Sequence, residues 1–68
     1  MTEPVNVYLE GGPDELPDRV VPLATPGAEL KIPHLSGYEH FRATPRHTDT
    51  AEGPLVTYEW FERTEVAG

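Results

Sequence analysis

The sequence predicts one small, mainly β domain, an antiparallel meander or partly open barrel of four or five short strands. Eight prolines are spread along the 68 residues and leave no window for a long helix. Between them, short stretches alternate apolar and polar residues, the period of a strand with one buried face. Glycine and proline clusters separate these stretches. We therefore expect at most one helical turn, near residues 13–16.

The segment 53–66 carries the strongest strand signal. It holds the only tryptophan and a dense run of β-branched and aromatic residues. Val56, Tyr58 and Trp60 share one face of a period-2 strand, and we expect this face to be the buried interior. The opposite, solvated face should carry the polar side chains Thr57, Glu59 and Arg63.

The N-terminal half predicts two strands. Residues 5–9 alternate apolar and polar, and the glycines and proline of 11–13 end the strand in a turn. Residues 19–23 are extended, but Pro22 cannot donate a backbone hydrogen bond, so this segment should be an edge strand or irregular. A turn is expected at 25–27.

The middle of the chain predicts two further strands. Residues 29–32 form a short one that Pro33 closes. Residues 38–43 form the next, and we expect Phe41 to point inward. The polar segment 44–54 contains proline and glycine and is expected to be a mobile loop before the last strand.

Two apolar residues contradict a simple two-faced last strand. Leu55 and Phe61 fall on the face opposite Trp60, where a solvated sheet should carry polar groups. Either a β-bulge re-aims Phe61, or a second surface of the protein is buried against something else.

Length and charge limit the classes of function. The 68 residues form one domain over 1–68, with 1–4 and 67–68 expected to fray. Twelve acidic against five basic residues give a net charge of −7, which repels nucleic acids and anionic lipid surfaces. The chain has no cysteine, no signal-peptide pattern and no apolar run of the ~20 residues that span a bilayer. We expect a cytoplasmic protein that gains burial by binding a protein partner or a second copy of itself.

No motif predicts catalysis, a cofactor or a metal. The spacing of His34, His40 and His47 matches no zinc signature. Ser36 lies between two of these histidines, but the strand-turn-helix context of a nucleophile is missing. The two glycines of the 11–13 turn could approach a ligand, although the acidic residues around them would oppose an anion.

Our first hypothesis is a non-catalytic accessory or protein-interaction module. It would dock through an aromatic-bearing face and an unpaired strand edge. The expected contact surface consists of four side chains, Glu10, Tyr38, His40 and Phe61.

Two alternatives belong to other classes. One is a small-ligand binder or minimal enzyme in which His40 or Glu39 transfers a proton. Its pocket would be built from Tyr38, Glu39, His40 and Tyr58. The other is an acidic inhibitor that mimics a polyanion with an unbroken stripe of Glu59, Glu62 and Glu65.

Four stretches together resemble a known family. They read Leu-Glu-Gly-Gly-Pro at 9–13, Lys-Ile-Pro-His at 31–34, Gly-Tyr-Glu-His-Phe at 37–41 and Tyr-Glu-Trp-Phe-Glu-Arg-Thr at 58–64. The sequence resembles a family of short uncharacterised proteins from high-GC Gram-positive bacteria, a domain of unknown function. The resemblance implies a free-standing accessory protein encoded near natural-product biosynthesis genes, and it assigns no site residue.

Overall fold

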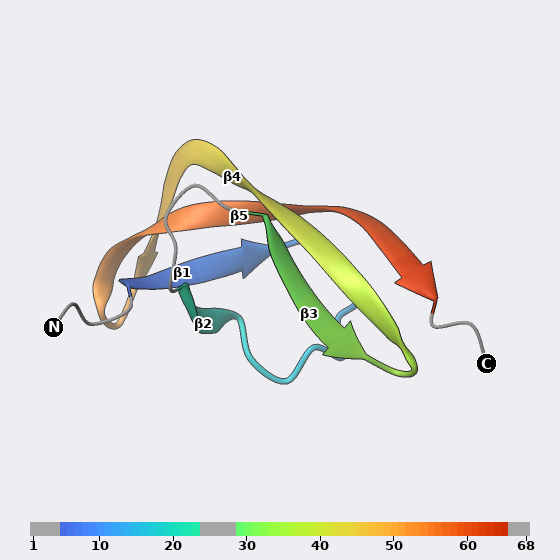
Figure 1. Ribbon diagram of the computed structural model, residues 1–68. Coiled ribbons are helices and arrows are strands. Elements are labelled where there is room, and N and C mark those ends of the chain that lie inside the picture. The colour runs from blue at the N-terminus through green and yellow to red at the C-terminus, as the bar shows by residue number, and fades with distance from the viewer. Residues whose placement is uncertain (1–4, 24–28, 66–68) are drawn as a thin grey trace, which may run out of the picture.

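The described residues, 5–23 and 29–65 of a computed structural model, form one five-stranded sheet (Figure 1). Its order across the sheet is β2-β1-β5-β4-β3, and no helix occurs among these residues. The strands are β1 (Val5–Glu10), β2 (Val20–Leu23), β3 (Leu30–His34), β4 (Gly37–Thr50) and β5 (Gly53–Glu65). The prediction of a small, mainly β, partly open fold is confirmed. The predicted turn at 25–27 and the termini expected to fray lie outside the described residues.

The sheet is mixed rather than antiparallel throughout. β1 pairs with β5 in parallel, with Tyr8 opposite Thr57 and Glu10 opposite Glu59, while the other three strand pairs are antiparallel. Consecutive strands joined by short turns must run in opposite directions. β1 and β5 are the first and last of the described strands, so no short turn constrains their relative direction.

The segment 44–54, predicted as a loop, instead forms the far end of the β4–β5 hairpin. His47 to Thr50 pair with Val56 to Gly53. The threonine hydroxyls stabilise this end: those of Thr48 and Thr57 lie 2.6 Å apart, and the hydroxyl of Thr50 donates to the carbonyl of Gly53 at 2.9 Å. β-Branched threonine favours a strand, and this preference outweighs the local turn signals.

A tight two-residue turn joins β3 to β4. Leu35 and Ser36 both adopt positive φ, 46° and 61°, as a type I′ hairpin turn requires. β3 was predicted to end before Pro33, but it continues through Pro33 to His34, which pairs with Gly37. A two-residue turn pairs the residues directly before and after it. β3 therefore extends as far as the turn.

Both free edges of the sheet carry a proline that points away from its partner strand. In β3, the pair next to the turn is hydrogen-bonded, so the ring nitrogen of Pro33 in the following pair faces outward. In β2, the amide of Leu9 donates to the carbonyl of Arg19 at 2.7 Å, and the same alternation turns the nitrogen of Pro22 outward. Each proline therefore removes no bond from the sheet and leaves a gap in its outer edge.

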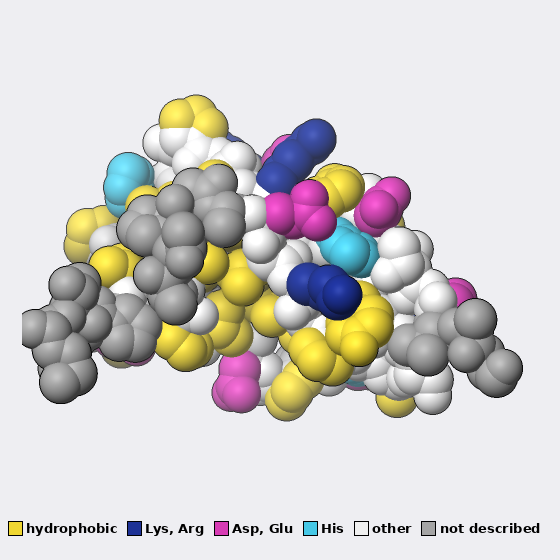
Figure 2. Space-filling model, viewed as in Figure 1, with side chains coloured by type: hydrophobic (Ala, Val, Ile, Leu, Met, Phe, Trp, Pro, Cys, Tyr) yellow, Lys and Arg dark blue, Asp and Glu magenta, His cyan; other side chains and the backbone are white. Residues whose placement is uncertain are grey.

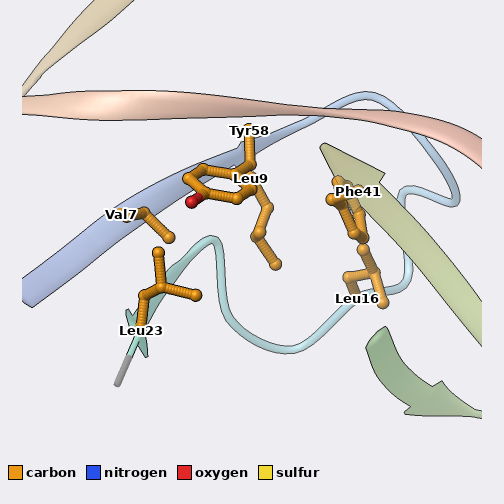
Figure 3. Close-up of a cluster of buried hydrophobic side chains, with 6 residues drawn as sticks. All are labelled: Val7, Leu9, Leu16, Leu23, Phe41 and Tyr58. Atoms are coloured by element: carbon orange, nitrogen blue, oxygen red, sulfur yellow. The ribbon is translucent and has the colours of Figure 1, made fainter. Parts of the chain in front are cut away.

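The hydrophobic core lies on the inner face of the curved sheet. Six buried side chains form it: Val7, Leu9, Leu16, Leu23, Phe41 and Tyr58. They lie between β1 and β5 on one side and β2, β3 and the β1–β2 connection on the other (Figure 3). The inward orientation predicted for Phe41 and Tyr58 is confirmed. On the side of the molecule where β2 and β3 are in the foreground, hydrophobic side chains gather in the middle, with charged ones beside and above them (Figure 2).

Trp60 is on the same face as Tyr58 but outside the core. It pairs with Phe41 across the β4–β5 ladder, yet 38% of its surface is exposed. β1 ends at Glu10, so no strand side chain covers the indole on that side. Gly12 lies against the ring instead: a Cβ at this position would be 3.0 Å from the indole Cδ1. The expectation that Trp60 is a core residue was therefore wrong.

Arg19 stabilises the β1–β2 connection. The guanidinium of Arg19 donates to the carbonyls of Gly11 at 2.6 Å and Pro13 at 2.9 Å. The amide of Leu16 bonds to the carbonyl of Pro13 at 3.3 Å, which closes a turn but not a helix. The Gly-Gly-Pro segment is therefore a structural turn, because the carbonyls of Gly11 and Pro13 accept hydrogen bonds from Arg19 of the same chain. The connection that follows places Leu16 in the core.

The hydroxyl of Tyr58 is buried and finds no hydrogen-bond partner among the described residues. A buried polar group without a partner costs about 1–3 kcal/mol. We expect Tyr58→Phe to raise the free energy of unfolding by about 1 kcal/mol, measured by urea denaturation. A loss of stability of similar size would contradict this and would show that a bound water satisfies the hydroxyl.

Candidate functional site on the outer face of the sheet

The outer face of the sheet, opposite the core, carries the candidate contact surface. Alternation along β1, β4 and β5 and the cross-strand register assign its side chains. They include Tyr8, Glu10, Glu29, Lys31, Tyr38, His40, Arg42, Arg46, Thr48, Thr57, Glu59, Phe61, Glu62 and Thr64. All four residues expected from the sequence, Glu10, Tyr38, His40 and Phe61, belong to this outer face, whereas Trp60 does not.

A β-bulge at Phe61 sets which β5 side chains reach this face. His40 pairs with Glu62 and Phe41 pairs with Trp60, so Phe61 has no partner of its own. A bulge was one of the two alternatives that the sequence left open, and it is present, but it does not turn Phe61 inward. Phe61 stays on the outer face, and the bulge instead shifts the alternation of the residues that follow it.

The ring of Phe61 lies between a histidine and an arginine. Its centroid is 6.0 Å from that of His40, with the planes tilted by 54°, and the Arg42 guanidinium carbon lies 5.3 Å above it. Guanidinium and aromatic rings attract through the ring quadrupole. Phe61 is thus held in one orientation although it is only partly buried.

His40 is a largely buried side chain of the outer face, with 9% of its surface exposed. Its Nδ1 lies 3.1 Å from a carboxylate oxygen of Glu29, and its Nε2 lies 2.8 Å from the hydroxyl of Thr64. Both ring nitrogens therefore have partners. His40 supports the position of Phe61, and neither nitrogen is left for a ligand.

An ion-pair cluster crosses three strands beside Phe61. The Arg46 guanidinium donates to both carboxylate oxygens of Glu10, at 3.0 and 2.8 Å, and reaches Glu59 at 3.4 Å. Arg42 lies 3.5 Å from the other oxygen of Glu59. The hydrogen bond from Arg46 and its charge lower the pKa of Glu10, against a smaller opposing effect of burial. The sequence did not identify Arg46, because the segment that carries it was expected to be a loop.

On the inner face, the bulge brings Arg63 to a buried carboxylate. Glu39 is 2% exposed; it accepts from the indole Nε1 of Trp60 at 2.8 Å and forms an ion pair with Arg63. Burial acts to raise the pKa of Glu39, but hydrogen bonds from Trp60 and Arg63 and the Arg63 charge outweigh it, and the pKa is lowered. Arg63 was expected on the solvated face, and the extra residue of the bulge is the reason it is not.

Arg63 also ties the β3–β4 turn to β5. Its guanidinium donates to the carbonyls of His34 at 3.1 Å and Leu35 at 2.7 Å, and to Glu65. Hydrogen bonds from Arg63 to Glu65 and Glu39 raise the pKa of its guanidinium further. A Cβ on Gly37 would lie 2.7 Å from this group and 2.6 Å from the Thr64 carbonyl, so only glycine fits there. The cluster is structural: its donors and acceptors satisfy one another.

The pocket of the small-ligand alternative is divided by the sheet. Tyr38 and His40 lie on the outer face, while Glu39 and Tyr58 lie on the inner face. The three histidines lie at separate positions of the sheet, and the described residues contain no group of three metal-ligating side chains. This geometry favours contact with a surface over enclosure of a small molecule.

The polyanion-mimic alternative also lacks its stripe. Arg42 and Arg46 pair with Glu59, Arg63 pairs with Glu65, and the bulge separates Glu59 from Glu62. No continuous row of free carboxylates runs along β5.

Comparison with known proteins places the chain in a family. A family model described as a family of unknown function, DUF5988, matches residues 1–68. The chain belongs to the DUF5988 family. No curated protein and no solved structure shows significant similarity to this DUF5988 chain. The part of the chain that the structure describes contains no helix long and apolar enough to cross a membrane.

Proposed function

We propose that this DUF5988 protein is a non-catalytic interaction module that docks on protein through the outer face of its sheet. One observation carries the proposal: Phe61 lies on the outer face, fixed between His40 and Arg42 and separate from the core. Rigid aromatic side chains beside arginine are typical of the residues that contribute most to protein–protein affinity.

The surroundings of Phe61 support the same function. Lys31 lies 4.4 Å over the ring of Tyr38, and Arg42 covers Phe61 from the other side, so both aromatic rings are oriented before a partner arrives. Binding by preoriented side chains loses less conformational entropy. By contrast, the outward-facing prolines make both strand edges poor templates for an added strand, so the face rather than an edge is the docking surface.

The role we propose is accessory. From the family resemblance of its sequence motifs, we propose that the protein acts in the cytoplasm of high-GC Gram-positive bacteria and assists natural-product biosynthesis. It would position or stabilise a protein of such a system, and none of its own side chains would carry a reaction step.

Photocrosslinking tests the docking face. The photoreactive amino acid p-benzoylphenylalanine replaces Phe61 in the native host, and a second strain carries it in place of Leu35, which is 70% exposed at the β3–β4 turn. We expect irradiation to give crosslinked protein species from position 61 that are absent from position 35. Equal products from both positions, or none from position 61, would contradict a docking role for the outer face.

A further inference from the structure

We infer that the partner of the outer face is a second copy of this chain, so that two sheets pack face to face in a two-fold symmetric dimer. The inference rests on the proposed function and names its partner. It follows from three features: the charge balance of the outer face, the arrangement of charges across three of its strands, and the closed edges of the sheet.

The outer face around Phe61 is close to neutral on a strongly acidic chain. Three basic residues, Lys31, Arg42 and Arg46, lie there with four acidic ones, Glu10, Glu29, Glu59 and Glu62. The chain as a whole has a net charge of −7 from twelve acidic and five basic residues, so the remainder of the sequence holds eight acidic against two basic residues. Two copies can therefore meet through this region with less charge repulsion than the net charge of the whole chain would produce.

A row of paired residues across β5, β4 and β3 is complementary to its own copy. Glu62 pairs with His40, and His40 pairs with Lys31, so an acid and a base flank His40 at one strand spacing on each side. A two-fold axis that runs parallel to the strands between two stacked sheets exchanges left and right. An axis over His40 therefore brings Glu62 of each copy opposite Lys31 of the other. Phe61 lies on the same strand as Glu62, so each Phe61 ring lies one strand spacing from the axis and faces β3 of the other copy.

Lys31 and Glu62 can pair with a second copy without breaking an ion pair within their own chain. The ion pairs formed among the described residues engage Arg42 and Arg46 but neither Lys31 nor Glu62. The Glu10–Arg46–Glu59 cluster stays paired within each copy, so stacking does not leave its charges without partners. Association through the edges is disfavoured because Pro22 and Pro33 interrupt them. Face-to-face stacking of the outer faces needs neither edge.

Sedimentation velocity of the purified chain tests the inference over a series of concentrations. We expect a reversible rise from 7.6 kDa to twice that mass. Phe61→Asp should abolish the rise, and the matched control Leu35→Asp, with the same added charge on an exposed apolar position, should leave it unchanged. The emission of Trp60, which lies on the inner face, confirms that each variant is folded.

A charge exchange separates a direct contact from a structural effect. Lys31→Glu and Glu62→Lys alone should each weaken dimerisation at least tenfold, and the double variant should recover it because the complementary row is restored with reversed sign. Failure of the double variant to recover, with wild-type Trp60 emission, would overturn the inferred arrangement.

The outcomes for the two proposals differ. A wild-type chain that stays monomeric at every concentration, yet crosslinks from position 61 to other proteins in the host, overturns the second copy as partner and leaves the docking function intact. A chain that gives no crosslink from position 61, to itself or to another protein, overturns both.

Discussion

Phe41→Ala is expected to leave most of the chain unfolded at room temperature. Phe41 is fully buried at the centre of the core, and truncation of such a side chain costs about 3–5 kcal/mol. A single core in a domain of this size rarely supplies more than about 3–5 kcal/mol in total. Urea denaturation followed by the fluorescence of Trp60 measures the loss, because the indole lies on the same face and its surroundings change on unfolding.

Phe61→Ala is the matched control, since the same truncation is made in the same hairpin on the opposite face. Phe61 is only partly buried and contacts His40 and Arg42 rather than the core, so we expect a loss of about 1 kcal/mol or less. Equal losses for the two phenylalanines would show that the faces of β4 and β5 are wrongly assigned.

Glu39→Gln is expected to have the second largest effect and to change the acid limit of the fold. The amide can still accept from Trp60, but the charge that Arg63 pairs with is lost inside the protein. Hydrogen bonds to charged groups contribute about 1.5–3 kcal/mol, so we expect the free energy of unfolding at neutral pH to fall by about 2 kcal/mol.

The pH dependence follows from the lowered pKa of Glu39. Its ordinary value is 4.5, and a carboxyl whose pKa is lower in the folded state stabilises the fold fully above that value. This contribution is lost as the pH falls below 4.5 and through the lower pKa of the folded state. Unfolding free energies measured from neutral to acid pH should therefore converge for wild type and Glu39→Gln at the acid end.

Glu59→Gln is the control for general charge effects. Glu59 pairs with Arg42 and Arg46 on the outer face, where its side chain is 39% exposed. Such pairs contribute little, so this variant should keep both the neutral-pH stability and the acid slope of wild type within about 1 kcal/mol. A wild-type acid slope in Glu39→Gln would contradict the assignment of the slope to Glu39.

The strands with clear alternation could be predicted from the sequence. β1 and β2, the inward Phe41 and Tyr58 and the outward Phe61 follow from period-2 patterning and from proline positions, whereas the bulge was only one of two alternatives. The four residues expected at the contact surface do share one face, because alternation fixes which way a side chain points once a strand is correctly placed.

The far end of the β4–β5 hairpin could not be predicted in the same way. Its polar residues and Pro45 resemble a loop, and only the repeated threonines indicate a strand. As a result, the sequence did not predict that Arg46 lies on the outer face with a bidentate contact to Glu10. The parallel pairing of β1 with β5 was missed because strand order depends on contacts between distant parts of the chain.

The bulge changes which face the residues after Phe61 occupy, and local patterning does not predict this change. One extra residue at Phe61 reverses the alternation beyond it, which moves Arg63 inward to Glu39 and leaves Glu62 beside His40. The position of a bulge within a strand changes every assignment that follows it. Sequence reasoning foresaw the irregularity but not its effect on Arg63, and it therefore missed the Glu39–Arg63–Trp60 cluster.

The central position of β5 affects how the molecule acquires its fold during synthesis. Of the five described strands, β5 is synthesised last, yet it alone joins the β1–β2 hairpin to the β3–β4 hairpin. A nascent chain without it holds two separate hairpins, and isolated two-stranded hairpins are at best marginally stable in water. The sheet must therefore assemble after translation has passed β5, by closure of long chain segments, which makes folding slow and cooperative.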